Sequence, residues 1–209
     1  MVLLIGMLAM APIMLLVNRY YKIPLWKVLI ILVILTALPY FACKLMFYLE
    51  NRQWDGQSFF GAVLMAPLLA WLTAKIVREP VSAVMDLHAP AVCIMLAVQK
   101  VNCMVAGCCR GKIFAYASNG DSIRFPSQIV EGAVALLLCL FLFWLLDKEK
   151  HRGKLLPWFM VLYGVSRFGL NLMRETTPVL WGMAIGNIWS IVSVFIGFVV
   201  FALMAKKKA

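Results

Sequence analysis

Charged residues are scarce in this sequence. Only 14% of its 209 residues are Asp, Glu, Lys or Arg, whereas 64% are hydrophobic and the mean hydropathy is +0.92. A soluble domain of this size would expose far too much apolar surface, so the composition predicts a membrane protein. The formal net charge is +11, yet no basic, aromatic-rich soluble segment is present to bind nucleic acid. The excess of Lys and Arg is instead typical of membrane-protein loops.

The sequence also lacks a disulfide framework and a recognisable set of metal ligands. Its six cysteines are scattered, and most stand in apolar runs, where cysteine behaves as a small hydrophobic residue: Cys43, Cys93, Cys103, Cys108, Cys109 and Cys139. Three of them are close together, but no histidine or second cysteine pair has metal-ligand spacing. We therefore favour packing and turn formation over a metal site for these three, and expect no cofactor.

No soluble domain, low-complexity linker or internal repeat interrupts the chain. No basic segment precedes the first apolar run, so we expect that run to remain as a helix and not to act as a cleaved signal. Seven apolar runs are long enough to cross a bilayer: residues 1–17, 25–49, 59–77, 87–107, 129–146, 155–173 and 188–204. The prediction is an all-α polytopic membrane protein, with seven transmembrane helices in one integral domain over residues 1–209.

The distribution of Lys and Arg among the connections predicts the orientation. With the N-terminus outside, twelve of these residues fall in cytoplasmic segments and five in outside loops, as the positive-inside rule requires. The predicted topology is therefore N-terminus outside and C-terminus cytoplasmic. The outside loop 108–128 holds three of the five outside cations, so we expect it to serve something other than orientation.

Charged residues also occur within the apolar runs. From the helical rise of 1.5 Å per residue, Lys100 and Arg167 lie at about the same depth, roughly 18 to 20 Å from the cytoplasmic ends of their helices. Glu131 lies just inside the outer end of its helix. Such charges are costly and face a cavity or each other. One interpretation is a Glu131–Arg167 ion pair that fixes helix packing; the favoured one is a site for an anionic group, for which a phospholipid phosphate is the obvious candidate.

Residue spacing supports one shared pocket. Two helical faces contribute to it, at spacings i, i+3, i+7 and i, i+4, i+7 respectively: Lys100, Cys103 and Gly107; Arg167, Asn171 and Arg174. Gly107 and Gly111 would permit close approach of a ligand or neighbouring backbone. Pro126 precedes an expected helix start, with Ser127 as a possible cap and Gln128 in the first turn. A helix N-terminus directed at the same anion would add a favourable dipole.

Several segments resemble the prolipoprotein diacylglyceryl transferases of bacterial membranes. The resemblance covers most of the chain and rests on WDGQSFFGAVL (54–64), MDLHAPAVCIMLAVQKVNCMVAGCCRGK (85–112), RFPSQIVEG (124–132), YGVSRFGLNLMRE (163–175) and GNIWS (186–190). It implies seven helices with the same orientation in the bacterial plasma membrane. It also implies transfer of a diacylglyceryl group from phosphatidylglycerol to the thiol of a lipobox cysteine in a prolipoprotein, with release of glycerol phosphate.

The sequence departs from the family pattern at several positions. Phe60 stands where the family has a histidine, and Lys100 replaces an arginine, which keeps the charge but loses the bidentate fork for phosphate. Cys103, Cys108 and Asn171 replace an Asn, a Glu and an acid. His88 lies near the opposite membrane face and is interpreted as a capping or packing residue. Cys108 is interpreted as a turn residue, with a role as base or nucleophile as the alternative.

Two hypotheses follow. The first is a divergent enzyme that moves a diacylglyceryl or related group from phosphatidylglycerol to a prolipoprotein thiol or another acceptor; the second is a non-catalytic phospholipid-binding protein or transporter on the same scaffold. We assign catalytic roles to Lys100 and Arg167, because cations must neutralise the charge that develops on the leaving phosphate. The expected phospholipid-binding residues are Arg124, Ser127, Gln128, Glu131, Cys103, Gly107, Cys108, Asn171 and Arg174.

Overall fold

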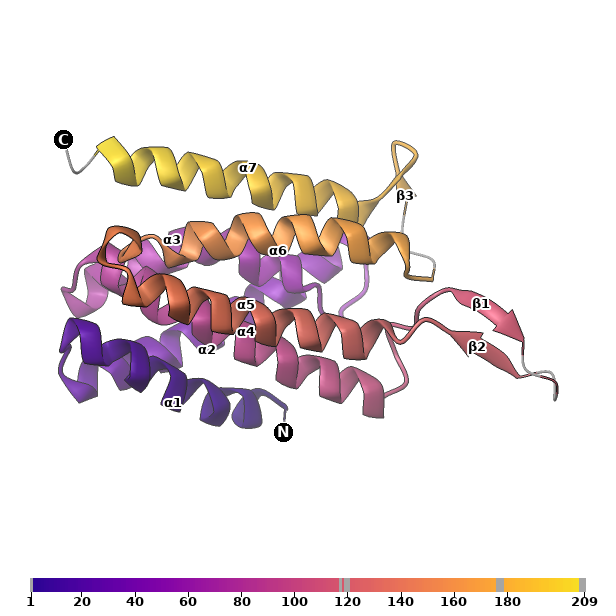
Figure 1. Ribbon diagram of the computed structural model, residues 1–209, viewed down its shortest axis with the longest axis horizontal. Coiled ribbons are helices and arrows are strands. Elements are labelled where there is room, and N and C mark those ends of the chain that lie inside the picture. Colours follow the sequence, from indigo (N-terminus) through magenta and orange to yellow (C-terminus); the bar gives the residue numbers. More distant parts are fainter. Residues whose placement is uncertain (1, 117, 119–120, 176–178, 207–209) are drawn as a thin grey trace.

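Seven long helices account for most of the chain (Figure 1). The computed structural model describes residues 2–206 except 117, 119–120 and 176–178. The helices are α1 (Val2–Tyr21), α2 (Leu25–Asn51), α3 (Phe59–Val77), α4 (Val81–Val105), α5 (Ser127–Asp147), α6 (Leu155–Leu172) and α7 (Ile185–Lys206), and a short 3-10 helix η1 (Glu149–His151) joins α5 to α6. The all-α polytopic prediction is confirmed. The orientation of the termini stays a prediction.

Six of these helices are long and apolar enough to cross a membrane. The exception is α6, whose eighteen residues include Arg167 and Asn171. It nevertheless packs against α4, α5 and α7 and lies alongside them in the bundle (Figure 1). The polar residues of α6 therefore face an interior position, and their presence there calls for partners or a ligand.

Two short antiparallel hairpins were not predicted. Strand β1 (Ile113–Tyr116) pairs with β2 (Ser122–Arg124), and β3 (Val179–Leu180) pairs with β4 (Met183–Ala184). Both lie at the same end of the bundle, and β1–β2 projects beyond the helices (Figure 1). We call this the hairpin end; helix α7 finishes at the opposite end of the bundle.

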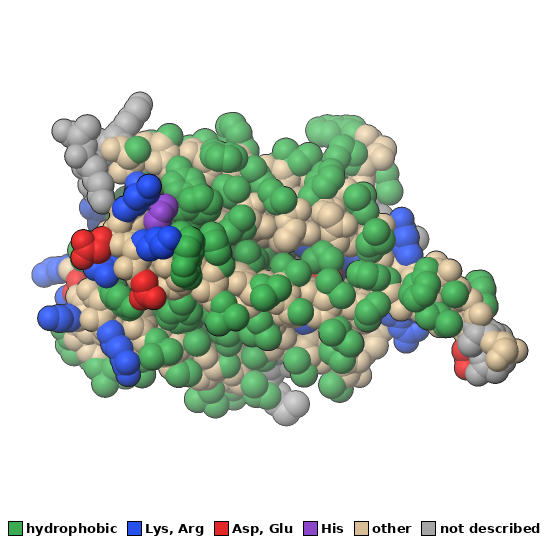
Figure 2. Space-filling model, in the orientation of Figure 1, with side chains coloured by type: hydrophobic (Ala, Val, Ile, Leu, Met, Phe, Trp, Pro, Cys, Tyr) green, Lys and Arg blue, Asp and Glu red, His purple; other side chains and the backbone are tan. Residues whose placement is uncertain are grey.

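Helix α4 forms the centre of the bundle. In its apolar window 67% of residues are buried, compared with 22% for α1 and for α7. It packs against α1, α3, α5 and α6. Apolar side chains cover the flank of the molecule, whereas most charged side chains visible in this view gather at the end opposite the hairpins (Figure 2). A lipid-facing flank with charged ends is the expected surface of a membrane-spanning bundle.

Helix α4 also binds the start of α6 at the end opposite the hairpins. The buried carboxylate of Asp86 accepts hydrogen bonds from the Tyr21 hydroxyl at 2.5 Å and from the backbone N–H groups of Gly153 and Leu155 at 2.5 and 2.9 Å. Because the first N–H groups of a helix have no partner within it, this carboxylate stabilises the α6 N-terminus. His88 is fully buried and stands well inside the bounds of α4. It is therefore a packing residue and not a helix cap.

Candidate functional site

A buried carboxylate, Glu131, lies at the hairpin end near the start of α5 and is only 4% exposed. Its Oε2 forms ion pairs with Lys100 of α4 and Arg167 of α6. Its Oε1 lies 3.9 Å from Nε of Arg174, which follows α6. The structure therefore brings four predicted site residues together from three segments. The Glu131–Arg167 pair considered from the sequence exists, but it is one side of a larger cluster.

This cluster, which we call the cation cluster, consists of Lys100, Arg167, Arg174 and Glu131. Three cations surround one carboxylate, so among the described residues the cluster has a net charge of +2. Lys100 and Arg167 are 7% and 9% exposed. Because charges at this depth are poorly hydrated, they attract an anion more strongly than surface charges do.

Many polar atoms around the cation cluster lack hydrogen bonds. Within the described part of the chain, ten buried side-chain N or O atoms have no hydrogen-bond partner. Half of these belong to four residues: Glu131 Oε1, Arg167 Nε, Arg174 Nε, and Asn171 Nδ2 and Oδ1. Buried polar groups are normally satisfied, so such a concentration indicates a place where a ligand or water completes the bonding. A small cavity of about 10 Å³, lined by Leu96, Tyr163 and Leu170 among others, reaches Glu131 and Arg167.

The loop after α4 is held by the start of α5. Ser127 Oγ donates to the Cys109 carbonyl at 2.6 Å, and Gln128 Nε2 donates to the Cys108 carbonyl at the same distance. The prediction that Ser127 caps α5 is wrong: the residue before the helix is Pro126, and no side-chain cap bond forms. The two side chains instead fix the loop that carries Cys108 and Cys109, which we call the cysteine loop. Their roles in lipid binding stay predictions.

The same loop departs from the predicted helical spacing. Because α4 ends at Val105, Gly107 lies beyond the helix with φ +65°, and Cys109 has φ +58°. The prediction that Gly107 shares a helical face with Lys100 and Cys103 is therefore wrong. A left-handed residue reverses the chain direction, and cysteine adopts this conformation at a cost. The reversal turns the loop back over the end of α4.

This reversal brings three cysteines together. One sulfur from each of Cys103, Cys108 and Cys109 lies within 4.8 Å of the others, a proximity that the sequence spacing did not predict. Cys103 is buried, Cys109 is intermediate and Cys108 is exposed. The hydrogen bond from Cys103 lowers the pKa of the Cys109 thiol to about 5, and Lys100 and Arg174 lower it too, although burial opposes them.

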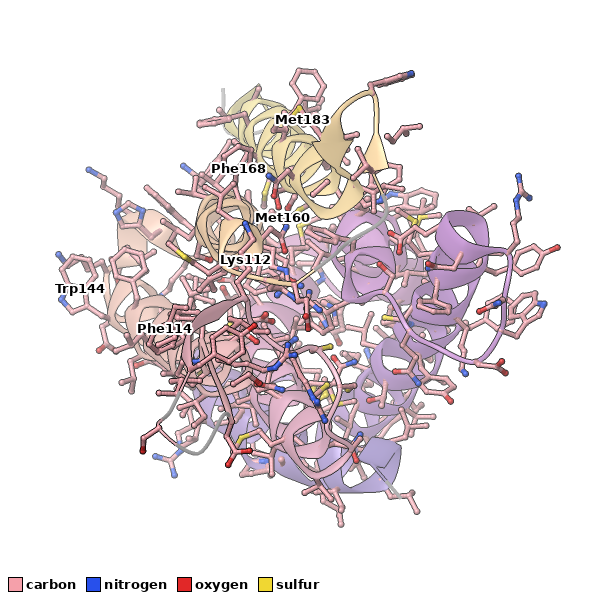
Figure 3. The ribbon with its side chains drawn as sticks, turned by 90° about the vertical axis from the view of Figure 1, so that its right-hand side faces the viewer. Lys112, Phe114, Trp144, Met160, Phe168 and Met183 are labelled. Atoms are coloured by element: carbon pink, nitrogen blue, oxygen red, sulfur yellow. The ribbon has the colours of Figure 1, made fainter. Side chains whose placement is uncertain are left out.

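Backbone pairing fixes Arg174 next to this loop. Gly111 forms a β-bridge with Arg174. On either side of this bridge, Lys112 N–H donates to the Met173 carbonyl at 2.9 Å and Glu175 N–H donates to the Arg110 carbonyl at 3.2 Å. Gly111 is needed because a Cβ there would lie 2.2 Å from the Phe125 carbonyl oxygen, which bears out the predicted close approach. In the end view of Figure 3, Lys112 lies near the middle of the molecule.

Arg124 stands apart from the other predicted site residues. It pairs with Glu175 at the base of the β1–β2 hairpin, where both side chains are partly exposed. This pair connects the hairpin to the segment that carries Arg174. Its predicted contact with phospholipid stays a prediction.

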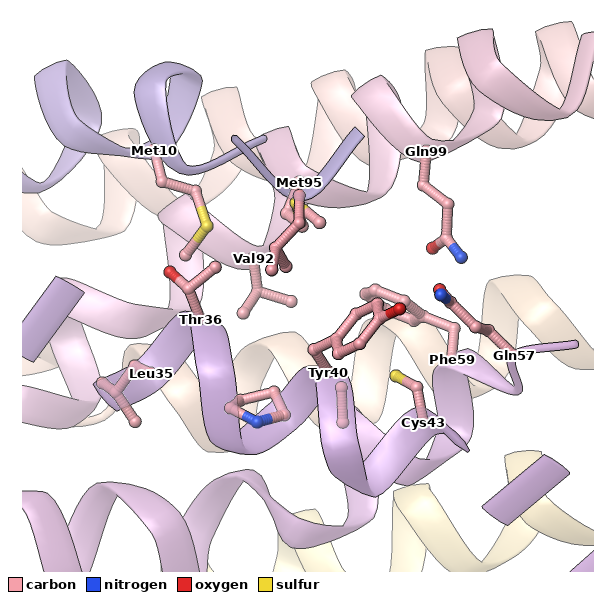
Figure 4. A pocket seen from close by; sticks show the side chains of 13 residues that line it. Met10, Leu35, Thr36, Tyr40, Cys43, Gln57, Phe59, Val92, Met95 and Gln99 are labelled. Atoms are coloured by element: carbon pink, nitrogen blue, oxygen red, sulfur yellow. The ribbon is translucent and has the colours of Figure 1, made fainter. Parts of the chain in front are cut away.

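A larger cavity of about 70 Å³ lies between α1, α2, α3 and α4. Apolar side chains such as Met10, Leu35 and Val92 line most of it. At one end the Gln57 and Gln99 side chains point toward each other (Figure 4). No sequence pattern predicts this cavity, although Gln57 lies in the WDGQSFFG segment and Gln99 directly precedes Lys100. An apolar groove with polar groups at one end suits an amphiphile.

The comparisons with known proteins agree with this geometry. A family model described as prolipoprotein diacylglyceryl transferase matches residues 34–203, well over half of the chain. The chain belongs to this family. The matched region includes the cation cluster, the cysteine loop and most of the larger cavity.

Curated relatives in this family are bacterial enzymes at modest identity. A phosphatidylglycerol–prolipoprotein diacylglyceryl transferase of Polaromonas naphthalenivorans is 31% identical over 141 residues, covering 63% of this chain and 52% of the relative. Transferase 2 of Clostridium perfringens is 26% identical over 131 residues, covering 58% and 51%. A transferase of Teredinibacter turnerae is 29% identical over 132 residues, covering 59% and 46%. The chain spans about half the length of the curated relatives it matches.

Within the prolipoprotein diacylglyceryl transferase family, Phe60 is the departure with the clearest structural consequence. It is buried and lies against Tyr163, with ring centroids 5.9 Å apart. The two histidines of the chain, His88 and His151, lie within α4 near its N-terminus and in η1, so neither is placed to act as a base at the cation cluster. A general base at the cation cluster would therefore have to be a group other than histidine.

Proposed function

We propose that this chain transfers the diacylglyceryl group of phosphatidylglycerol to a cysteine thiol of a prolipoprotein; its curated relatives are named phosphatidylglycerol–prolipoprotein diacylglyceryl transferases. The observation that carries the proposal is the cation cluster, with two positive charges in excess among the described residues. A phosphodiester carries one negative charge, and a phosphate monoester carries about two at neutral pH. The excess therefore suits the leaving group better than the bound substrate.

The reaction makes clear demands on the site. The acceptor sulfur attacks the carbon that bears the phosphate ester, a C–S bond forms, and the C–O bond breaks with its electron pair remaining on the phosphate oxygen. Lys100, Arg167 and Arg174 would hold that phosphate and stabilise the charge that grows on it. Stabilisation that increases toward the transition state accelerates the reaction, whereas equal binding of substrate and transition state does not.

The larger cavity supports a lipid donor. Its apolar walls suit an acyl chain, and of the two glutamines at its polar end, Gln99 directly precedes Lys100 in the sequence. A phospholipid with a chain in this cavity would place its phosphate toward the cation cluster. A setting in a bacterial plasma membrane, with a lipobox prolipoprotein as acceptor, is part of the same proposal.

The second candidate is a phospholipid-binding protein without transferase activity. Phe60 favours it, because a buried phenyl ring stands where the family motif has a histidine. This candidate keeps the phosphate and acyl-chain sites but omits the chemical step.

The test is incubation of the purified full-length chain, in mild detergent, with labelled phosphatidylglycerol and a lipobox peptide. We expect a thioether-linked diacylglyceryl peptide, and none when the peptide cysteine is replaced by serine. Bound phosphatidylglycerol with no product, in assays with and without Zn²⁺, an ion that the three neighbouring cysteine sulfurs could bind, would reject the transferase and support the lipid-binding candidate. Arg19→Ala, which changes an exposed arginine on α1, is the matched control for arginine substitutions.

A further inference from the structure

The three-cysteine cluster at the end of α4 differs from the other cysteines of the chain. Cys43, Cys93 and Cys139 are buried within helices, as small apolar residues are. Cys103, Cys108 and Cys109 instead place their sulfurs within 4.8 Å of one another. Sulfurs bound to one tetrahedral Zn²⁺ at 2.3 Å lie about 3.8 Å apart. Small side-chain rotations therefore suffice to bring all three onto one ion.

The backbone holds the cluster in this arrangement at a cost. Cys109 keeps a positive φ of 58°, which is unfavourable for a residue with a Cβ. Ser127 and Gln128 fix the carbonyl groups of Cys109 and Cys108. A loop that only had to end α4 would not need both side-chain bonds and a strained cysteine. Strain held by surrounding bonds is common where a site is pre-formed.

The surroundings also suit a metal thiolate centre. Three thiolates and one divalent ion carry a net charge of −1, and the adjacent cation cluster has an excess of two positive charges among the described residues. Exposed Cys108 provides access from solvent, which a metal site requires.

We propose that Cys103, Cys108 and Cys109 bind one thiophilic metal ion of the Zn²⁺ class and leave its fourth position open. Soft thiolate ligands select such ions over Mg²⁺ and Ca²⁺. Three protein ligands with an open fourth position are the arrangement of catalytic zinc sites, whereas structural sites are closed by four.

The open position takes the acceptor thiol; this part of the inference rests on the proposed function. A thiol that coordinates such an ion is deprotonated, and its proton passes to solvent. The bound sulfur then attacks the donor carbon, a C–S bond forms, and the C–O bond to phosphate breaks with its electron pair on the phosphate. The ion thus replaces the base that is missing where Phe60 stands.

Metal binding is measured on the full chain, purified in mild detergent with a non-thiol reductant and no chelator. Elemental analysis after Zn²⁺ addition should give one ion per chain. Cys103→Ala and Cys109→Ala should each weaken Zn²⁺ binding at least tenfold, whereas Cys139→Ala, at a buried cysteine outside the cluster, should leave it unchanged. Equal binding by all variants, less than a tenth of an ion per chain, or a Cys103–Cys109 disulfide that persists under reduction would overturn the site.

Co²⁺ in place of Zn²⁺ gives a readout of the fourth position. The absorption spectrum of the Co²⁺ protein should change when the lipobox peptide is added and remain unchanged with its serine analogue. No change with the cysteine peptide would reject the open position. Transfer that continues in metal-free protein would reject the role of the metal in the reaction and leave the proposed function intact. Bound Zn²⁺ with no transfer would reject the proposed function and leave the metal site intact.

Discussion

Each end of the bundle buries a carboxylate, Asp86 of α4 at one end and Glu131 of α5 at the other, but the two carboxylates have different partners. Asp86 accepts hydrogen bonds from one hydroxyl and two backbone N–H groups, all neutral. Glu131 instead faces three cations. No Asp86 oxygen is among the unsatisfied buried atoms of the described chain, whereas one oxygen of Glu131 and several atoms around it are. Asp86 completes a helix end, and Glu131 belongs to an incomplete site.

This contrast separates a structural charge from a functional one. A carboxylate whose lone pairs are filled by backbone donors stabilises the fold and attracts nothing further. A carboxylate outnumbered by cations in a poorly hydrated place leaves a positive potential for a ligand. The two regions should therefore respond to substitution in opposite ways.

The largest expected effect is that of Arg167→Ala on transfer. Removing a cation that stabilises developing charge should lower the rate about 100-fold, while the folded yield stays normal because Glu131 retains Lys100. Rates with labelled phosphatidylglycerol and yields from size-exclusion chromatography measure both, with Arg19→Ala as the control. A collapse of folded yield with Arg167→Ala would make the cation cluster structural, like the Asp86 site.

Asp86→Ala should show the opposite pattern. It leaves the N–H groups of Gly153 and Leu155 without their acceptor, and we expect a loss of about 3 kcal/mol in stability. Thermal unfolding in detergent checks this, and Asp86→Asn, which keeps one acceptor oxygen, should lose less. Transfer per folded molecule should be unchanged. A folded Asp86→Ala protein that has lost transfer would refute the division between the two ends.

Lys100 allows a finer test of the cation cluster. Lys100→Ala should lower transfer about tenfold or more, because a hydrogen bond to a charged group is worth roughly 1.5 to 3 kcal/mol. Lys100→Arg should retain or raise the rate, since it keeps the charge and restores a planar fork for phosphate. An arginine variant as inactive as the alanine variant would show that Lys100 acts by shape and not by charge.

The smallest expected effect comes from Ser127, which fixes the cysteine loop. Ser127→Ala removes the bond to the Cys109 carbonyl and should cost about 1 kcal/mol, with transfer lowered less than tenfold. Ser193→Ala is a matched control, because Ser193 makes a similar buried bond to the Met160 carbonyl at 2.9 Å away from the cluster. Equal effects of both variants on transfer would show that the position of the cysteine loop has no specific role in transfer.

The sequence was sufficient for the helices and for the depth of the charges. Long apolar runs place helices directly, and the fixed rise per residue set Lys100 and Arg167 at one level. Rotation about each helix axis was harder to predict, because helices that are apolar all round carry no stripe to orient them. The Lys100–Glu131 pair was missed for that reason.

The shape of the cysteine loop could not be predicted from the sequence, for a different reason. Its shape depends on positive φ angles at Gly107 and Cys109 and on side-chain bonds from α5. Neither leaves a periodic pattern. The hairpin strands β1 and β2 were missed because four- and three-residue strands within a loop give too short an alternation to recognise.

Lipid analysis of the purified protein tests the central claim, that the cation cluster binds an anionic headgroup, most directly. The chain is purified in mild detergent, and its bound lipid is identified and counted by mass spectrometry alongside Arg167→Ala. We expect an anionic glycerophospholipid at about one per chain in the unaltered protein and its loss in the variant. Recovery of only zwitterionic or neutral lipid, or equal retention of the anionic lipid by Arg167→Ala, would contradict the claim.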